Sequence, residues 1–129
     1  MPLDTKMDNT TATPQDGDQT AFAERLDRSD IDQMTQNAEA AAAFLKAISH
    51  EGRLMILCHL VTGEKSVTEL ESLLSARQAA VSQQLSRLRL EGLVVPRREG
   101  KTIYYRLADD RPRKMLECVY ELFCKDDQD

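Results

Sequence analysis

The spacing of the apolar residues changes abruptly at Gly92. Before it, the segment "QAAVSQQLSRLRLEG" places Val81, Leu85 and Leu88 three and four positions apart, which is the spacing of one helix face. After it, "LVVPRREGKTIYYRL" alternates apolar with polar residues around the Glu-Gly pair at 99–100, which is the pattern of two strands joined by a turn. A helix that ends at a glycine and passes directly into a β-hairpin leaves few ways to arrange this part of the chain.

Helical patterns also precede and follow this unit. The alanine-rich segment from Asp30 predicts a first helix, and "RLMILCHLV" predicts a second. Ser66, with Glu69 three positions later, is a capping-box signature for a short third helix over residues 66–74. An aspartate at 109 or 110 can cap a last helix that runs through "RKMLECVYELFCKD". We therefore expect a mainly α protein with a small β-hairpin, in the order α-α-α-α-β-β-α.

The beginning of the chain has a different composition. Residues 1–29 are rich in Asp, Thr, Gln and Pro with almost no apolar periodicity, and they are predicted to form a disordered acidic and polar tail. Residues 30–127 then form one domain. The chain has no run of 18 apolar residues, and its N-terminus lacks the apolar stretch of a signal peptide. We expect no membrane contact and a cytoplasmic location, where thiols are kept reduced.

Charge is unevenly distributed along the sequence. The formal net charge of −5 by itself disfavours a nucleic-acid partner. Residues 77–106, however, contain seven basic and only two acidic side chains. This basic segment coincides with the fourth helix and the hairpin, and it fits either a solvated charged face or a surface that binds a polyanion.

Two short helices joined by a tight turn, followed by a hairpin with a basic tip, are the parts of a winged helix-turn-helix. The second of these helices carries side chains of the types that read bases in the major groove: Gln78, Ser82, Gln83 and Arg87. The hairpin carries side chains that bind phosphates: Arg97, Arg98 and Lys101. The polar residues of this helix can also be only its solvated side. The basic hairpin that follows it at the distance expected for a wing favours DNA binding instead. We therefore predict double-stranded DNA as the partner.

These segments resemble the ArsR-type winged-helix transcriptional repressors over about residues 38–125. The resemblance rests on "FLKAISHEGRLMILCHL", "SVTELESLL", "RREGKTIYYRL" and, most specifically, "VSQQLSRLRLEGLV". It implies a homodimer whose first and last helices form the interface. It also implies a palindromic operator that is released when a small-molecule inducer binds.

Many repressors of the family that this chain resembles sense metals, through thiolates on the third helix or through Asp and His on the last one. Here the third helix contains no cysteine and the last helix contains no histidine. We therefore expect no metal and no other cofactor at those places. A different site built from Cys58, His59, Cys118 and Cys124 stays open, although adjacent residues point about 100° apart on a helix and do not readily bind one ion.

The cysteines are the remaining candidates for sensing. Cys58 shares a predicted apolar stripe with Leu57 and Val61 and should point inward. Cys118 and Cys124 lie six positions apart, which separates them by about 240° around a helix, so only one of them can face Cys58. Cys118 aligns with Met115 and Leu122 on a stripe that could serve dimer contacts, and it is predicted to pack there as a small hydrophobe. Cys124 lies near the helix end and should be accessible from solvent.

The positions of Cys58 and Cys124 are similar to those of the reactive pair in the persulfide- and sulfide-responsive BigR/SqrR-type repressors. The resemblance implies that the reduced protein binds its operator and that persulfides or polysulfides bridge the two cysteines and release it. The regulated genes would then serve sulfide detoxification. The same cysteines leave open a repressor that senses peroxide through a disulfide, or one that senses a metal, a metalloid or haem.

Two other classes of protein fit the sequence less well. An enzyme would need a nucleophile, a base and oxyanion donors in one pocket, and the chain offers only His50 and His59 as imidazole bases. We expect no enzymatic activity, and a cysteine peroxidase is the least implausible one. A winged helix used only for protein contacts would lack salt-dependent binding to its own promoter DNA.

Overall fold

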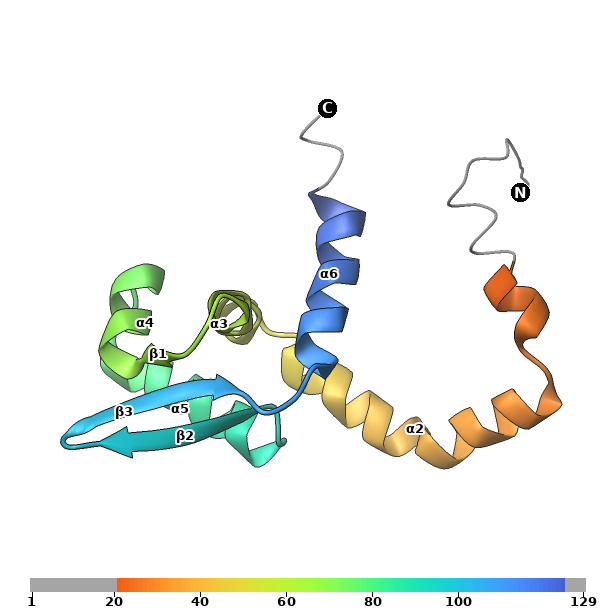
Figure 1. The fold of residues 1–129 in the computed structure, drawn as a ribbon, viewed down its shortest axis with the longest axis horizontal. Helices are drawn as coiled ribbons and strands as arrows, with labels where there is room; N and C mark the ends of the chain where they lie inside the picture. Colours follow the sequence, from red (N-terminus) through yellow and green to blue (C-terminus); the bar gives the residue numbers. More distant parts are fainter. Residues whose placement is uncertain (1–20, 125–129) are drawn as a thin grey trace. The chain divides into compact units, whose positions relative to one another are not determined.

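The computed structural model describes residues 21–124, and this part of the chain contains five main helices and a small sheet (Figure 1). The elements are α2 (Arg28–Ile48), α3 (Glu51–Val61), β1 (Lys65–Ser66), α4 (Val67–Leu74), α5 (Gln78–Leu90), β2 (Val94–Glu99), β3 (Thr102–Leu107) and α6 (Arg111–Phe123). One helical turn at residues 21–25 precedes them. The predicted fold, mainly α with a small β-hairpin in the order α-α-α-α-β-β-α, is confirmed, and β1 is an addition to it.

The chain divides into two compact units, residues 1–40 and 41–129. Within the described residues, the first unit contains the turn at 21–25 and the N-terminal part of α2. The second contains the end of α2 and every element from α3 to α6. The residues assigned from the sequence to DNA binding and to thiol chemistry all lie in this second unit. No helix among the described residues is both long and apolar enough to cross a lipid bilayer.

Helix α2 begins earlier than predicted, because two aspartates cap it. The Asp30 N–H donates to Asp27 Oδ1 at 2.9 Å, and the Asp27 N–H donates to Asp30 Oδ2 at 3.1 Å. The hydrogen bond from the Asp30 backbone is the main cause that lowers the pKa of Asp27. The predicted disordered tail over residues 1–29 is therefore wrong for residues 21–25 and for Arg28 and Ser29, which are helical. The rest of that prediction falls mainly on residues 1–20, which lie outside the described residues.

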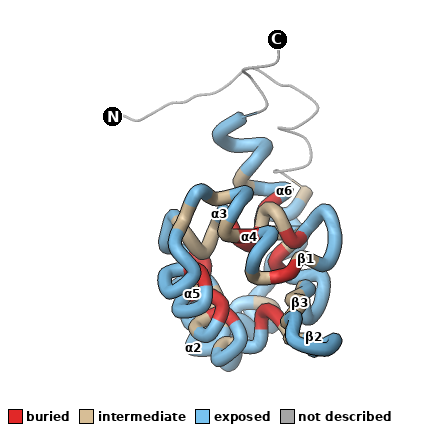
Figure 2. Tube along the Cα trace, turned by 90° about the vertical axis from the view of Figure 1, so that its left-hand side faces the viewer, coloured by how far each residue is buried: buried red, intermediate tan, exposed pale blue. Residues whose placement is uncertain are grey.

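The core of the second unit forms where α3, α4, α5 and the sheet meet (Figure 2). Helix α5 buries Val81, Leu85 and Leu88, as its spacing predicts, and turns its polar side to solvent. The other apolar residues of this core are Ala47, Ile48, Ile56, Leu57, Leu60, Leu70, Leu93, Val94 and Leu116.

Helix α3 packs differently from the prediction. Leu57 is buried as expected, but the other buried positions are Ile56 and Leu60, while Val61 is 40% exposed and Cys58 is half-buried. Because α3 contacts α4, α5, α6 and β3, it is apolar on several sides, and its sequence contains no single decisive stripe. The predicted stripe is therefore wrong at Val61, and Cys58 lies at the edge of the core rather than inside it.

The sheet consists of three antiparallel strands in the order β1-β3-β2. The predicted hairpin is confirmed: β2 pairs with β3, and Gly100 turns the chain between them with a φ of +62°. The short strand β1 was not predicted, because the sequence pattern around Ser66 indicates only a helix cap. In the structure Ser66 is both the last residue of β1 and the N-cap of α4. Its Oγ accepts from the Glu69 N–H at 3.0 Å, and Glu69 Oε1 accepts from the Ser66 N–H at 2.7 Å, which confirms the capping box.

Two side chains fasten the junction between α2 and α3. His50 caps α3, since its Nδ1 accepts from the N–H of Gly52 at 3.0 Å and from that of Arg53 at 3.4 Å. The Arg53 guanidinium donates from Nε to the Ala47 carbonyl at 2.6 Å and from Nη1 to Gln84 Oε1 at 3.3 Å. Arg53 therefore connects the end of α2, the start of α3 and the middle of α5.

Replacing His50 by alanine should lower the free energy of unfolding by about 1 kcal/mol, because α3 loses the acceptor for its first N–H groups. His50→Asn supplies another capping acceptor and should lose much less. Urea denaturation followed by far-UV circular dichroism measures both variants. Equal losses in the two would contradict a role for the cap hydrogen bonds.

Candidate nucleic-acid interface and thiol site

A tight turn joins α4 to α5. Helix α4 ends at Ser75, whose φ of +52° lies in the left-handed region, and the N–H of Ala76 donates to the Glu71 carbonyl at 3.1 Å. Helix α5 then begins after Arg77 as its N-cap. The buried positions of α5 hold one side of this helix on the core, so the turn and the core together fix which side faces solvent.

Three of the four predicted base-reading side chains of α5 are exposed: Gln78, Ser82 and Gln83. They lie in the N-terminal half of the helix, which is the half that a recognition helix inserts into the major groove. Arg87, the fourth, is half-buried nearer the C-terminal end, with its Nε 3.6 Å from Glu91 Oε2. The structure thus brings the first three together and places Arg87 apart, beside a carboxylate.

The wing, meaning β2, β3 and the turn between them, approaches the start of α5. Lys101 in the turn lines one cleft together with Gln78 and Ser82 of α5, and with Thr68 and Ile103. A wing residue and two helix residues predicted to bind DNA therefore share one continuous surface.

Arg97 and Arg98 are neighbours in β2 and therefore point to opposite faces of the wing. Arg97 donates from Nη2 to Glu64 Oε1 at 2.7 Å, from Nε to Glu64 Oε2 at 3.0 Å, and from Nη1 to Glu99 Oε1 at 2.8 Å. Its guanidinium also lies over the ring of Tyr104, 4.6 Å from the centroid. The hydrogen bonds from Arg97 lower the pKa of Glu64. Arg97 is thus held by carboxylates of its own chain.

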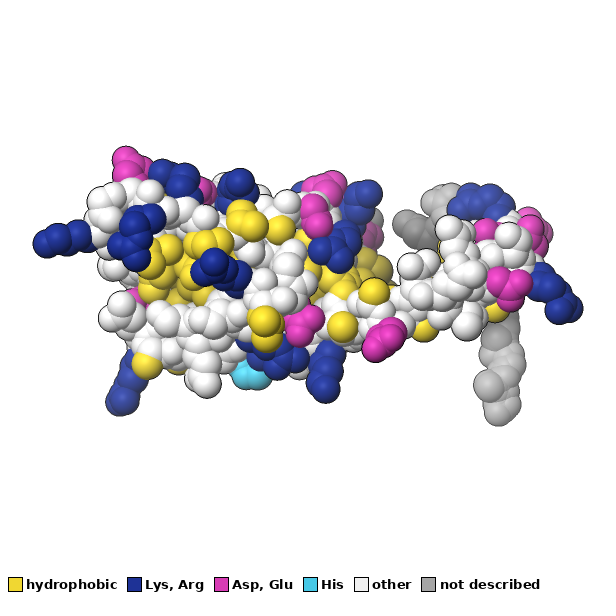
Figure 3. Space-filling view, turned by 90° about the horizontal axis from the view of Figure 1, so that it is seen from below, with side chains coloured by type: hydrophobic (Ala, Val, Ile, Leu, Met, Phe, Trp, Pro, Cys, Tyr) yellow, Lys and Arg dark blue, Asp and Glu magenta, His cyan; other side chains and the backbone are white. Residues whose placement is uncertain are grey.

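Arg98 lies on the opposite face, where it lines a groove with Arg89 of α5. At this end of the molecule, Lys and Arg side chains are scattered around a patch of exposed apolar atoms (Figure 3). Sequence reasoning missed both Arg89 and Glu64. The alternation of side chains along a strand could have placed the two adjacent arginines on different faces, but it does not point to Glu64 or Arg89 as their neighbours.

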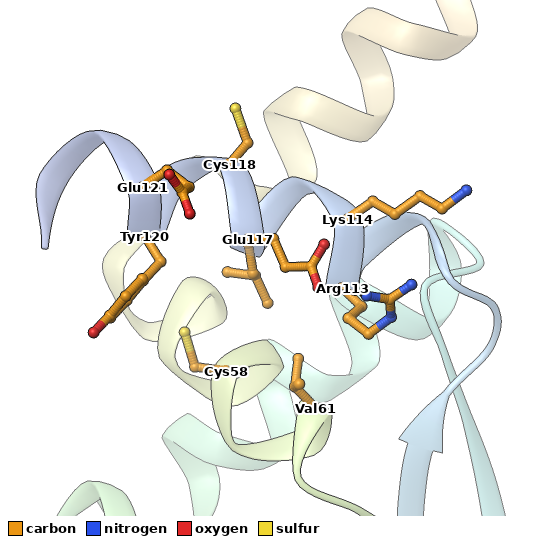
Figure 4. Close-up of a pocket in the computed structure, with 9 residues that line it drawn as sticks. Cys58, Val61, Arg113, Lys114, Glu117, Cys118, Tyr120 and Glu121 are labelled. Atoms are coloured by element: carbon orange, nitrogen blue, oxygen red, sulfur yellow. Dashed lines mark hydrogen bonds and ion pairs between the residues drawn. The ribbon is translucent and has the colours of Figure 1, made fainter. Parts of the chain in front are cut away.

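Cys58 lines a cavity of about 630 Å³ between α3 and α6 (Figure 4). Other lining residues of this cavity include Leu116, Glu117 and Tyr120 of α6. The side chain of Cys58 points toward α6, whereas the sulfur of Cys118 points away from Cys58 (Figure 4). Cys118 is exposed. Cys118 was predicted to pack on a stripe that could serve dimer contacts, and in the single chain this stripe leaves it in solvent.

Cys124 follows the last residue of α6, where its N–H donates to the Tyr120 carbonyl at 2.8 Å, and it is exposed, as its place in the sequence predicts. Burial raises the pKa of the Cys58 thiol, and the charge of Cys124 raises it further. Cys58 is therefore a weaker acid than an ordinary cysteine.

Among residues 21–124, no three His, Cys, Asp or Glu side chains are grouped closely enough to hold a metal ion. The set that the sequence left open, Cys58 and His59 with Cys118 and Cys124, does not form such a group. The geometry therefore offers no support for metal sensing at these cysteines.

Helix α4, the tight turn, helix α5 and the wing together define a DNA-binding protein of the winged helix-turn-helix class. Within this class, residues 50–95 match the family model described as "Bacterial regulatory protein, arsR family". The chain is 47% identical over 91 residues to the Biofilm growth-associated repressor of Agrobacterium fabrum. The aligned region covers 70% of this chain and 78% of that protein. The chain belongs to the arsR family.

Two further comparisons agree with this assignment. The chain is 41% identical over 98 residues to the transcriptional activator HlyU of Vibrio cholerae, which covers 76% of this chain and 91% of that protein. It is also similar to the crystal structure of the transcriptional repressor BigR from Xylella fastidiosa, with a TM-score of 0.69 and 42% identity, over 72% of this chain and 95% of that one. These relatives are transcriptional regulators, and the shared fold includes the DNA-binding elements.

The contact between Glu64 and Arg97 should make stability depend on pH in a specific way. Because the pKa of Glu64 is lowered in the folded protein, its contribution is complete above the ordinary glutamate pKa and is lost as the pH falls through the lowered value. Between about pH 6 and about pH 3, the melting temperature of the wild type should fall more than that of Glu64→Gln, which cannot titrate there. Thermal unfolding followed by circular dichroism at each pH measures this, and parallel curves for the two proteins would rule the contact out as a source of stability.

Proposed function

We propose that this chain is a thiol-based transcriptional repressor. The reduced protein binds operator DNA, and persulfides or polysulfides release it by bridging Cys58 and Cys124, which controls genes of sulfide detoxification. The observation that supports the proposal is the position of the half-buried Cys58, whose side chain points toward α6 in the cavity between the two helices, while the exposed Cys124 directly follows the end of α6. Repression is supported by the names of two relatives, the Biofilm growth-associated repressor and BigR.

In this proposal the N-terminal half of α5 enters the major groove. Gln78, Ser82 and Gln83 are exposed there and can donate to and accept from base edges. Lys101 and Arg98 of the wing bind the backbone and add affinity without much sequence information. The two other predicted DNA-binding residues, Arg87 and Arg97, contribute less, because each already lies beside a carboxylate of its own chain.

The protein acts as a homodimer through α2 and α6. Both helices carry large apolar side chains that the single chain leaves in solvent, among them Leu45 on α2 and Leu122 and Phe123 on α6, which are 50%, 71% and 74% exposed. Burying such residues against a second copy is the usual reason for a chain to keep them. The exposed Cys118 of α6 would then be covered by the partner.

The chemistry begins at Cys124 because it is exposed, whereas burial makes Cys58 hold its proton more tightly than an ordinary cysteine does. The Cys124 thiolate attacks the outer sulfur of a persulfide RSSH, the S–S bond of the donor breaks, and the thiolate RS⁻ leaves. Each repetition adds one sulfur to the growing Cys124 chain and releases one more RS⁻. Cys58 closes the bridge by attacking the sulfur next to the end of that chain, which expels HS⁻. The released sulfide takes up the two electrons that the bridged cysteines lose.

The number of sulfur atoms in the bridge provides selectivity. A direct disulfide needs the two Cα atoms within about 7 Å, whereas each inserted sulfur lengthens the bridge by about 2 Å. If α3 and α6 hold the two cysteines beyond disulfide distance, a polysulfide can link them without moving the backbone. Peroxide, which supplies no sulfur, then gives no intramolecular bridge.

Helix α3 connects the thiols to the DNA-binding elements. At its start, Arg53 donates to Gln84 in the middle of α5, and just after its end, Glu64 accepts from Arg97 of the wing. A bridge that fixes α3 against α6 therefore affects α5 and the wing at the same time. The two recognition helices of a dimer must enter two half-sites that lie about one helical turn of DNA apart. A small displacement of α5 and the wing in each protomer therefore weakens operator binding.

Treating the reduced protein with glutathione persulfide should weaken its affinity for a duplex from its own promoter by roughly 5- to 150-fold, the range of ordinary allosteric coupling. Fluorescence anisotropy measures this directly. Cys58→Ser and Cys124→Ser should bind the duplex and fail to release it. Cys118→Ser is the matched control, since it removes a thiol from the same helix and should respond like the wild type. If the affinity of the treated wild type for the duplex is unchanged, the proposal is wrong. If Cys118→Ser stays bound to the duplex after persulfide treatment, the pairing of Cys58 with Cys124 is wrong.

Mass spectrometry of the same reaction should find the peptides of Cys58 and Cys124 joined by more than two sulfur atoms. For each bridge, one hydrogen sulfide should be released, together with one glutathione for every persulfide consumed. Peroxide should leave these two peptides unlinked. A plain two-sulfur bridge with both reagents would instead favour a peroxide sensor.

A further inference from the structure

A groove runs between the C-terminal part of α5 and the face of the wing that is turned toward it. It is lined by Arg89 of α5 and by Pro96, Arg98, Ile103 and Tyr105 of the wing. The strand register explains this set: Arg98 pairs with Ile103 and Pro96 pairs with Tyr105, so all four occupy one face of the hairpin. The groove therefore combines an apolar floor with two guanidinium groups.

The two arginines of the groove differ from their neighbours in the same elements. Arg97 in β2 is bound by two carboxylates, and Arg87 in α5 lies beside one. In the part of the chain that the structure describes, Arg89 and Arg98 form neither an ion pair nor a side-chain hydrogen bond, and both are exposed. Two uncompensated positive charges in one groove repel each other, and an anion between them relieves that repulsion.

The groove is continuous with the surface that faces DNA in the proposed function. Ile103 lines both this groove and the cleft formed with Gln78, Ser82 and Lys101. A DNA strand that follows the wing from Lys101 therefore passes the groove, and the anions that it presents are its phosphates.

We propose that Arg89 and Arg98 together hold one backbone phosphate of duplex DNA in this groove. Guanidinium groups bind phosphate oxygens through paired, charge-assisted hydrogen bonds. The apolar side chains of Pro96, Ile103 and Tyr105 offer contact to the deoxyribose next to that phosphate. Arg89 is then a DNA-binding residue that the sequence did not single out, and its contact is independent of base sequence. The proposal rests on the DNA binding of the proposed function and not on its thiol chemistry.

The test is the salt dependence of DNA binding by the reduced, full-length protein. Fluorescence anisotropy over a series of salt concentrations gives the slope of log K against log[salt] for two duplexes, one from the chain's own promoter and one of unrelated sequence. The variants are Arg89→Ala, Arg98→Ala and the double variant. Arg106→Ala is the matched control, because it removes the same charge from the same hairpin but on the other face, where it assists Arg97 in lowering the pKa of Glu64.

The double variant should lower the magnitude of the slope by about 0.9, the value for one lost phosphate contact, and each single variant should produce part of that change. The change should be the same on both duplexes, and Arg106→Ala should keep the wild-type slope. Thermal unfolding verifies that each variant is folded, and Arg89→Lys with Arg98→Lys should restore most of the slope by restoring the charge.

Three outcomes would overturn the proposal: an unchanged slope in the double variant, an equal loss in Arg106→Ala, or a loss confined to the promoter duplex. A wild type that binds neither duplex would remove the proposed function and this proposal with it. A wild type that binds both, with an unchanged slope in the double variant, would remove this proposal alone.

Discussion

The packing of α3 against α5, α6 and the sheet is the constraint on which the rest of the second unit depends. Ile56, Leu57 and Leu60 are almost completely buried there, so α3 cannot move without disturbing the elements around it. The same short helix presents Cys58 to α6 and is anchored to α5 at its start through Arg53. The cysteine of the proposed thiol chemistry and the DNA-binding elements are thereby attached to one buried helix, which is a physical basis for the proposed coupling between them.

The parts of the fold that could be predicted from the sequence are those decided by local patterns. The buried side of α5 follows from the spacing of Val81, Leu85 and Leu88, and the start of α4 follows from the capping pair Ser66 and Glu69. The hairpin follows from its alternation and its turn glycine. In each case one short segment determines the local structure, and the tertiary packing agrees with that local preference.

The parts that could not be predicted depend on what lies opposite a residue in space. Helix α3 is apolar around much of its circumference, so its sequence does not reveal that Val61 is exposed while Ile56 is buried. The seven predicted DNA-binding residues share suitable chemistry, yet Arg97 is held by Glu64, a residue from a distant loop that no local pattern connects to it. The exposure of Cys118 and the influence of Cys124 on Cys58 likewise depend on how α6 lies against α3.

Strand β2 forms one edge of the sheet, because β3 lies in the middle. Its sequence places Pro96, which has no N–H to offer, directly before Arg97, Arg98 and Glu99. A proline and a row of charges on an edge strand prevent a strand of another molecule from adding to the sheet. The projecting hairpin is therefore protected against edge-to-edge aggregation, even when many copies are crowded along one stretch of DNA.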